Sequence, residues 1–422
     1  MRSFLAAAAA SILCLAASAP AKVIGRVTAA APLSEARIAA LPVGQRAPWI
    51  VYWKQSQALM AADKAALAAE RKGLAAIPSG PPSGSPKSMS LNRDAVWYGS
   101  AEARRIADNI VSFQTPAGGW GKNQNRAGPS RLLGQSYVVV EKLSATGEDW
   151  AFVGTIDNGA TTTELRFLAR VQQAFPGPQG PAYRTAFLKG LRYLLEAQYP
   201  NGGWPQIYPL EGGYHDAVTF NDDAMMHVVE LLADVAAKRN DYAFVPHALA
   251  AQARVAVDRA VALILRTQVV VRGTHTGWAQ QYDELTLDPA GARNFEPASL
   301  SSYESAAVLS FLMRLSSPSP EVVRAVHDGA AWLKAQALRD VEWIDSGPGG
   351  RRLLPKAGAG PIWARFYDIA SMQPIFGDRD KSIHDSANEL SLERRNGYSW
   401  FGSVPTRSLR LYERWAPAYP RR

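Results

Sequence analysis

A glycine-glycine-tryptophan signature recurs along this chain, each time after a stretch with the periodicity of an amphipathic helix. The first copy reads Gln114-Thr-Pro-Ala-Gly-Gly-Trp120, and the second reads Gln198-Tyr-Pro-Asn-Gly-Gly-Trp204. A third segment starts at Gln268 and carries the looser Thr276-Gly-Trp278. A long aromatic-rich loop and a second helical stretch follow in each case. Repetition of one helix–loop–helix unit predicts a tandem helical architecture.

Helical periodicity accounts for most of the chain after Ala95, and strand-like alternation is scarce. Thr161 with Glu164, and Ser301 with Glu304, have the spacing of capping boxes, which mark helix starts. The predicted helices cover residues 100–114, 161–175, 182–198, 221–238, 245–267, 301–315 and 320–337.

The connections between these helices alternate in length. Those after residues 175, 238 and 315 are short, whereas loops 115–160, 199–220 and 268–300 are long. In an up-down helical arrangement every second connection lies at the same end, so all the long loops share one face, where function is expected. The sequence therefore predicts a mainly α fold, an α/α toroid of about three helical hairpins, with residues 338–422 forming an irregular C-terminal lobe.

The N-terminus has the pattern of a secretory signal over residues 1–19. Arg2 precedes an apolar run from Phe4 to Ala17, which ends in a small-residue cleavage pattern and is too short to span a membrane. Cys14, the only cysteine, lies inside this run, so the mature chain can form neither disulfides nor thiolate metal sites. We expect a secreted or periplasmic protein with no stable membrane association.

Residues 20–90 differ in composition from the rest of the chain. Ala61 to Ala76 is a helical pattern, and Ile77 to Pro86 reads as a flexible linker rich in proline, glycine and serine. We expect this helix to pack against the main body without a function of its own. The catalytic toroid domain, including the C-terminal lobe, is then expected over residues 91–422.

The chain carries a formal net charge of +9, which loss of Arg2 with the leader reduces to +8. This excess favours an acidic partner. Nucleic acid is not expected, because no basic run is interleaved with aromatic residues and a secreted protein rarely meets it. An anionic polysaccharide suits the charge better.

Paired acidic and amide residues stand before two of the predicted helices. Asp157-Asn158 precedes the helix at Thr161, and Asn221-Asp222 lies at the start of the next one. Several hard oxygens at neighbouring helix starts suit Ca²⁺, which takes six to eight oxygen ligands. Helix capping is the alternative, because Asp and Asn are common N-cap residues; Asp157 lies four residues ahead of the better cap Thr161, which weakens that alternative there.

Three arginines stand in the later loops. Arg293 lies between Gly291 and Glu296, and Arg365 and Arg379 lie among aromatic residues. The planar guanidinium binds a carboxylate through two parallel hydrogen bonds, although each of these arginines could instead brace a loop. The tryptophans of the repeats, Trp120, Trp204 and Trp278, can stack on sugar rings or fill the end of the toroid as core residues.

At these residues the sequence resembles the pectate lyases of polysaccharide lyase family 10, over roughly residues 92–405. The motifs that carry the resemblance are Gly-Gly-Trp120-Gly-Lys122-Asn123, Thr155-Ile-Asp157-Asn158, Gly-Gly-Trp204-Pro-Gln206, Thr219-Phe-Asn-Asp222, Arg293 before Phe-Glu-Pro-Ala-Ser, and Arg365 with Arg379. The family's irregular α/α toroid agrees with the fold predicted from the loop lengths.

The resemblance implies a calcium site. Asp157 and Asp222 correspond to the calcium-coordinating carboxylates, with Asn158 as a further oxygen ligand. Asp223 departs from the family pattern, in which Asn is expected, and it adds a negative charge beside the proposed metal.

The resemblance also implies the roles of the basic residues. Arg293 matches the family's catalytic base, and Arg365 and Arg379 match ligands of substrate carboxylates. Lys122 is a further candidate of the same kind. Trp120 and Trp204 complete the expected substrate-binding set. Because Ca²⁺ and two further arginines would repel a charged guanidinium, we expect the neutral form of Arg293 to be favoured.

The reaction implied is calcium-assisted anti-β-elimination on α-1,4-linked polygalacturonate, which leaves 4,5-unsaturated oligogalacturonides, and a monomer is expected. Two alternatives stay open. An inverting glycoside hydrolase on an α/α toroid would use two carboxylates flanking a water, such as Asp157 and Asp222, with Glu296 as a further candidate. A non-catalytic anionic-glycan-binding protein would keep the toroid without turnover.

Overall fold

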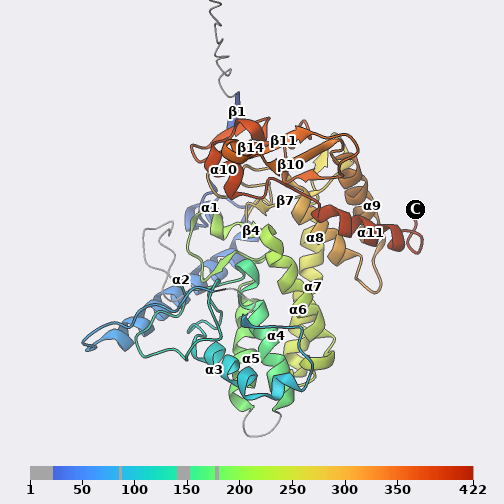
Figure 1. The fold of residues 1–422 in the computed structure, drawn as a ribbon. Coiled ribbons are helices and arrows are strands. Elements are labelled where there is room, and N and C mark those ends of the chain that lie inside the picture. Colours follow the sequence, from blue (N-terminus) through green and yellow to red (C-terminus); the bar gives the residue numbers. More distant parts are fainter. Residues whose placement is uncertain (1–21, 85–87, 140–152, 176–179, 422) are drawn as a thin grey trace, which may run out of the picture.

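The computed structural model describes residues 22–84, 88–139, 153–175 and 180–421. Helices dominate this part of the chain (Figure 1), and every helix predicted beyond residue 95 is confirmed with ends shifted by a few residues. The observed bounds are α3 (Ala101–Ser112), α4 (Thr162–Ala174), α5 (Pro181–Glu196), α6 (Ala224–Ala236), α7 (His247–Arg266), α8 (Ser302–Leu312) and α9 (Pro320–Ala335).

The helices form successive hairpins in two layers. α4 pairs with α5, α6 with α7, and α8 with α9. Across the hairpins, α4, α6 and α8 contact one another in succession, and so do α5, α7 and α9. This is the α/α toroid architecture predicted from the loop lengths. The toroid also contains α11 (Val404–Trp415), which packs against α8 and α9 although it lies in the stretch predicted to be irregular.

The glutamine that opens each repeat joins two helices to one loop. Its side-chain amide nitrogen donates to a carbonyl of its own loop and to a carbonyl of a helix further along the chain, which is α5, α7 or α9. Gln114 donates to Gly118 (2.8 Å) and Ala186 (2.9 Å). The same pair of bonds runs from Gln198 to Gly202 and Ala256, and from Gln268 to Thr276 and Ala325. The repeated glutamine therefore holds the start of each long loop against the helices.

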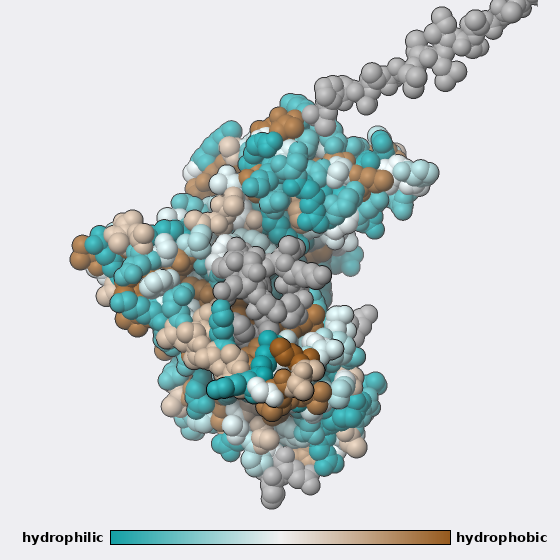
Figure 2. Space-filling model, turned by 90° about the vertical axis from the view of Figure 1, so that its left-hand side faces the viewer, coloured by the Kyte–Doolittle hydropathy of each residue, from teal (hydrophilic) through white to brown (hydrophobic). Residues whose placement is uncertain are grey.

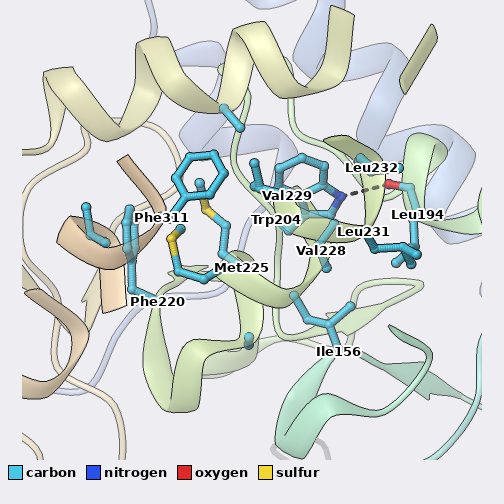
Figure 3. Close-up of a cluster of buried hydrophobic side chains, with 14 of the residues drawn as sticks. Ile156, Leu194, Trp204, Phe220, Met225, Val228, Val229, Leu231, Leu232 and Phe311 are labelled. Carbon is cyan, nitrogen blue, oxygen red and sulfur yellow. Dashed lines mark hydrogen bonds between the residues drawn. The ribbon is translucent and has the colours of Figure 1, made fainter. Parts of the chain in front are cut away.

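The tryptophan of each repeat is a core residue. In each of them the indole Nε1–H donates at 2.7 Å to a carbonyl in the last turns of the preceding helix, from Trp120 to Ile110, from Trp204 to Leu194 and from Trp278 to Ile264. Figure 3 shows the Trp204 bond among the apolar side chains of α6. Trp363 makes the same bond to Leu333 and adds a fourth unit.

The expectation that Trp120 and Trp204 bind substrate is wrong. Both side chains are 0% exposed, so no ring face is open to a sugar. The two glycines before each tryptophan make this burial possible, because a Cβ at Gly119 would lie 2.5 Å from the Tyr193 ring and one at Gly203 would lie 2.7 Å from Val218. The alternative weighed from the sequence, that these tryptophans fill the end of the toroid, is the correct one.

Short antiparallel strands lie in the long loops at one end of the helices, and they join these loops to one another or fold a loop back on itself. Because most of these strands are two residues long, no alternation marks them in the sequence. The pairs are β2 (Gly154–Thr155) with β3 (Ile207–Tyr208), β4 (Val218–Thr219) with β8 (Gln281–Tyr282), β5 (Val270–Val271) with β6 (Thr274–His275), and β9 (Leu300–Ser301) between β7 (Trp278–Ala279) and β13 (Phe366–Tyr367).

The C-terminal lobe lies over that same end of the toroid (Figure 1), and Figure 2 shows mostly hydrophilic side chains on its visible face. Its elements are small. They comprise the hairpin of β10 (Val341–Asp345) and β11 (Arg351–Pro355), the pair β12 (Trp363–Ala364) and β16 (Phe401–Gly402), the sheet of β1 (Val23–Arg26), β15 (Ser382–His384) and β14 (Phe376–Gly377), and helix α10 (Leu392–Gly397).

The N-terminal segment is longer and more tightly attached than the sequence suggested. After α1 (Glu35–Ala39), helix α2 runs from Val43 to Arg71, whereas the sequence predicted a helix only over 61–76. Polar side chains of α2 bind the long loops, since Ser56 Oγ accepts from the Leu210 amide (2.7 Å) and Asp63 accepts from the Ala117 amide (3.1 Å). α2 therefore packs on the main body, as expected.

The predicted linker after α2 is not loose where it is described. The Gly84 amide donates to the Asn123 carbonyl (2.7 Å), and the Asn125 amide donates to the Pro82 carbonyl (3.2 Å). These bonds fasten residues 82–84 to the first long loop. The predicted signal segment 1–19, with Cys14, lies outside the described residues. Across the ranges that are described, no helix has the length and apolar character needed to cross a membrane.

The glutamine bonds make a testable prediction about stability. Gln198→Ala removes one hydrogen-bond donor from each of two buried carbonyl oxygens and should lower the free energy of unfolding by about 2 kcal/mol. Gln57→Ala, at an exposed position of α2, is the matched control and should change it by less than about 0.5 kcal/mol. Chemical denaturation of both variants measures the difference; equal stabilities would contradict the assigned role of the repeated glutamine.

Candidate active site

Two acidic turns stand side by side where the long loops enter α4 and α6. They are short 3-10 turns, η3 (Asp157–Gly159) and η5 (Asn221–Asp223), and they contact each other. The middle residue of each turn has a positive φ, 52° at Asn158 and 49° at Asp222. Such backbone is unfavourable for residues other than glycine and tends to occur at functional sites. Neither Asp157 nor Asp222 caps a helix, so the capping alternative is wrong for both.

The two predicted capping boxes are also wrong, and the reason bears on the site. The glutamates at their ends do not return to the helix backbone but hold buried arginines. Glu164 binds Arg126, whose side chain is 0% exposed, at 3.0 Å. Glu304 binds Arg365 at 2.8 Å. The spacing that marks a capping box is used here to neutralise a buried guanidinium at a helix start.

The first turn carries a lysine–aspartate pair. Lys122 Nζ lies 2.8 Å from Asp157 Oδ2, and Asp157 Oδ1 accepts from the Asn158 amide at 2.9 Å. Asp157 is buried, whereas the Asn158 side chain is exposed and donates to Asn123 (3.2 Å). The structure thus brings together Lys122, Asp157 and Asn158, as the sequence motifs suggested.

The second turn is joined to the C-terminal lobe by Arg365. One guanidinium nitrogen of Arg365 donates to Asn221 (3.0 Å), Asp222 (3.1 Å) and Glu304 (2.8 Å). Burial would lower the pKa of Arg365, but the carboxylates of Glu304 and Asp222 outweigh it and raise the pKa well above its usual value. Arg365 is therefore a permanent cation against the exposed carboxylate of Asp222.

Asp223, the departure noted in the sequence, is placed beside these groups. Burial, followed by the negative charges of Glu304 and Asp222, raises the pKa of Asp223 to about 6. It lines a pocket between α6, α8 and α11 together with His227, Tyr303 and Arg314. Asp223 occupies the N-cap position of α6, but its side chain makes no capping hydrogen bond there.

Arg293 is held by Glu296, which the sequence suggested only as a possible acid of a hydrolase. Its Nε and Nη2 donate to the two oxygens of Glu296 at 2.8 and 2.6 Å. Glu296 also accepts from the Tyr398 hydroxyl (2.7 Å) and from the Arg293 amide (3.1 Å), so both its oxygens are engaged. This arrangement orients Arg293 and gives Glu296 no free oxygen for acid catalysis.

The charge environment of Arg293 differs from the one expected. Burial lowers its pKa, but the hydrogen bonds and charge of Glu296 outweigh burial and raise it. The expectation that neighbouring cations favour the neutral guanidinium is therefore wrong for the contacts described, because it left out the adjacent carboxylate. The Arg293 side chain is nevertheless 44% exposed, and its Nη1 takes no part in the fork to Glu296.

An aromatic platform gathers the remaining arginines. The Arg293 and Arg379 guanidinium carbons each lie 4.9 Å from the centre of the Phe295 ring, and that of Arg394 lies 4.2 Å from it. Tyr398 packs edge-on against Phe295 at 5.2 Å between ring centres and also lies under Arg365. Guanidinium groups stack favourably on aromatic faces, which holds these cations close together.

Two aromatic residues lie between the halves of the site. Tyr214 and His215 both interact electrostatically with Lys122 and Asp157 on one side and with Arg293 on the other. Burial, and then the charge of Lys122, lowers the pKa of His215 to about 4, so His215 is neutral near pH 7. Tyr214 and His215 therefore lie within electrostatic range of both the Asp157 turn and the Arg293 loop.

The residues present fit part of a calcium shell. Asp157 and Asp222 supply carboxylates from adjacent turns, and Asn158 adds an amide oxygen, all of them the hard donors that Ca²⁺ takes. In the part of the chain that the structure describes, no three His, Cys, Asp or Glu side chains converge as a metal cage. Such a shell would need oxygens from a substrate or water to reach six to eight ligands.

Several contributors to the site carried no signal in the sequence. Glu304 looked like a helix cap, and Tyr398 and Arg394 lie in the lobe predicted to be irregular, far along the chain from Arg293. Only their shared contacts with Arg365 and Phe295 bring them in.

The comparisons with known proteins agree with this geometry. The family model for pectic acid lyase matches residues 114–409. A family 10 polysaccharide lyase from Cellvibrio cellulosa superposes with a TM-score of 0.66 at 33% identity, over 76% of this chain and 95% of that one. A search of curated protein sequences returned no match.

A second structure is a single-residue mutant of a family 10 polysaccharide lyase from Cellvibrio cellulosa in complex with trigalacturonic acid. It has a TM-score of 0.65 at 32% identity, over 79% of this chain and 99% of that chain. The family match covers more than half of the chain and includes every long loop that builds the site. The chain therefore belongs to the pectic acid lyase family, and it is a polysaccharide lyase.

Proposed function

We propose that this lyase is a secreted pectate lyase that cleaves α-1,4-linked polygalacturonate by anti-β-elimination. The observation that carries the proposal is the gathering of Arg293, Arg365 and Arg379 on one aromatic platform beside the carboxylates of Asp157 and Asp222. A uronate polymer presents a carboxylate on every sugar, and guanidinium groups bind carboxylates through paired hydrogen bonds. The complex of a related enzyme with trigalacturonic acid supports this class of substrate.

Binding exchanges partners at the arginines. Arg365 keeps its buried contact with Glu304 and turns toward Asp222, whose side chain is 43% exposed. Arg379 is 60% exposed and is accessible to a carboxylate from solvent. Lys122 is paired with Asp157 in the first acidic turn of the same site. These cations would orient the uronate whose C5 proton is removed.

Arg293 would remove that proton. In the elimination, the C5–H electron pair forms the C4–C5 double bond, and the C5 proton passes to the neutral guanidine nitrogen. The C4–O bond breaks with its electron pair on the leaving glycosidic oxygen, which takes a proton from water. Glu296 fixes Nε and Nη2, which leaves Nη1 to face the substrate. Glu296 raises the pKa of Arg293, so the neutral form that can accept a proton is scarce near neutral pH. This form becomes more abundant only as the pH rises, and we therefore expect activity to be greatest under alkaline conditions.

Asp157 and Asp222, with Asn158, would hold Ca²⁺. When bound, the cation withdraws charge from the substrate carboxylate and stabilises the enolate-like state. To take up this role, Asp157 must exchange its contact with Lys122, and Asp222 must exchange its contact with Arg365. Each carboxylate lies on a turn that contains a positive-φ residue, and the two turns, η3 and η5, contact each other.

The assay for the proposal is the ultraviolet absorbance of the conjugated 4,5-unsaturated uronide. With unesterified polygalacturonate at alkaline pH, absorbance should rise in calcium and stop rising when EGTA is added. New reducing ends without absorbance would mean hydrolysis instead. Binding with neither signal would indicate a non-catalytic glycan-binding protein.

Arg293→Lys should lower kcat by about 100-fold or more, because lysine lacks the paired nitrogens that Glu296 orients. Binding of trigalacturonate, measured by calorimetry, should persist. Arg254→Lys, at an exposed position of α7, is the matched control and should keep full turnover. Near-normal kcat in Arg293→Lys would remove Arg293 from the role of base.

Glu296→Gln should move the rising limb of the pH–rate profile to lower pH. Loss of the carboxylate lowers the pKa of Arg293, so a larger fraction of the guanidine is neutral at any pH below that pKa. Each pH–rate profile is divided by that variant's maximum rate, so that a shift of the rising limb along the pH axis is not confused with a lower maximum rate. An unchanged limb would show that Arg293 is not the titrating base.

A further inference from the structure

Outside the groups named so far, the C-terminal lobe holds a carboxylate between two arginines. Arg394 Nε and Arg379 Nε both donate to Glu393 Oε2, at 2.8 and 3.3 Å. The Nη2 atoms of the same arginines both donate to Glu393 Oε1. Each oxygen of Glu393 therefore accepts one bond from each guanidinium, and the two forks face the carboxylate as a cradle.

The positions of the two arginines are fixed by the structure, because Asp378 links the backbone at Arg379 to the start of the helix that carries Arg394. Asp378 accepts from the Arg379 amide (2.6 Å) and from the amide and hydroxyl of Ser391, which starts α10. The Arg394 side chain is 4% exposed and lies on Phe295, and a Cβ at Gly397 would meet its Nη2 at 2.9 Å. Gly397 therefore leaves the space in which the Arg394 guanidinium lies.

The group that fills the cradle is, by contrast, at the surface. The Glu393 side chain is 57% exposed, and it lies in the first turn of a helix of six residues, α10. Hydrogen bonds from Arg394 and then Arg379 lower its pKa to about 2, so it is a carboxylate at any working pH. An exposed side chain on a built cradle can swing out, whereas Arg394 cannot leave.

The cradle adjoins the proposed reaction centre. The guanidinium groups of Arg293, Arg379 and Arg394 all pack on the Phe295 ring. The guanidinium carbons of any two of them are therefore no farther apart than the sum of their distances from the ring centre. A Cβ at Gly377, two residues before Arg379, would lie 2.5 Å from the Phe295 carbonyl, which shows how closely the two loops pack. A polymer lying across Arg293 would pass within reach of the cradle.

We propose that Arg379 and Arg394 together form a uronate subsite, and that Glu393 is a resident stand-in for the substrate carboxylate, which must displace it. The inference rests on the proposed function and deepens it, since it adds Arg394 as a substrate ligand and Glu393 as an internal competitor. The planar carboxylate of Glu393 and that of a uronate offer the same two acceptor oxygens to the same four N–H groups.

The first test is Glu393→Gln, assayed for kcat and KM on unesterified polygalacturonate. Removal of the competing charge should lower KM by about fivefold with kcat nearly unchanged, because the cradle would be free in a larger fraction of molecules. Glu342→Gln, which removes the ion-paired partner of Lys356 elsewhere in the lobe, is the control for net charge and should leave KM in place. A rise in KM for Glu393→Gln would mean that Glu393 positions Arg379 for the substrate, and it would overturn the inference.

The second test is a double-mutant cycle with Arg394→Lys. That variant keeps the charge but loses the fork, and its KM should rise about tenfold without a comparable fall in kcat. In Glu393→Gln/Arg394→Lys the gain from the glutamine should shrink to less than about twofold, because the two residues act through one cradle. Strictly additive effects would contradict the shared cradle. If the wild type gives no unsaturated product, the proposed function is wrong. If it gives this product but Glu393→Gln leaves KM unchanged, only the proposed uronate subsite is wrong.

Discussion

The hydrogen bond from a buried indole to the end of the preceding helix is the interaction on which the rest of the structure depends. It occurs at Trp120, Trp204, Trp278 and Trp363, at 2.7 Å in every case. Each bond satisfies a carbonyl in the last turns of a helix, where backbone acceptors lack helical partners, and it draws the start of a long loop down onto the toroid. Loops of this length would otherwise cost much conformational entropy to order.

The loops held in this way carry charges that neutralise one another before any substrate arrives. Lys122 lies on Asp157, Arg365 on Asp222 and Glu304, Arg293 on Glu296, and Arg379 with Arg394 on Glu393. Cations left alone on so crowded a face would repel one another. Under the proposed function, a polyuronate would replace the exposed carboxylates while the buried Glu296 and Glu304 keep the arginines in place. The exposed carboxylates are thus the groups that a substrate would displace, and the buried Glu296 and Glu304 are the groups that position the arginines.

Most of the candidate site residues that the sequence motifs predict lie together in the structure, with two exceptions that share one cause. Lys122, Asp157, Asn158, Asp222, Arg293, Arg365 and Arg379 all lie on the same face. Trp120 and Trp204 do not bind there, because the two glycines before each tryptophan let the loop pack closely enough to bury the indole ring. The sequence alone does not distinguish a tryptophan that stacks on a sugar from one in the core. Glu164 and Glu304 were read as caps because spacing along a helix does not show which distant arginine lies over its first turn.

What the sequence determined by itself was the helical order, the face on which the long loops lie and the family. Periodicity and loop length report local geometry, and local geometry follows from neighbouring residues. Tertiary structure alone decided the partners of the arginines. Arg394, Tyr398 and Glu304 join the site through contacts between residues that are distant in the sequence. Examples are Phe295 with Arg394 and, 144 residues apart, Asn221 with Arg365, and no local pattern records such contacts. The fourth repeat was hidden for the same reason, since the carbonyl bound by Trp363 lies 30 residues back instead of the 10 found for Trp120 and Trp204.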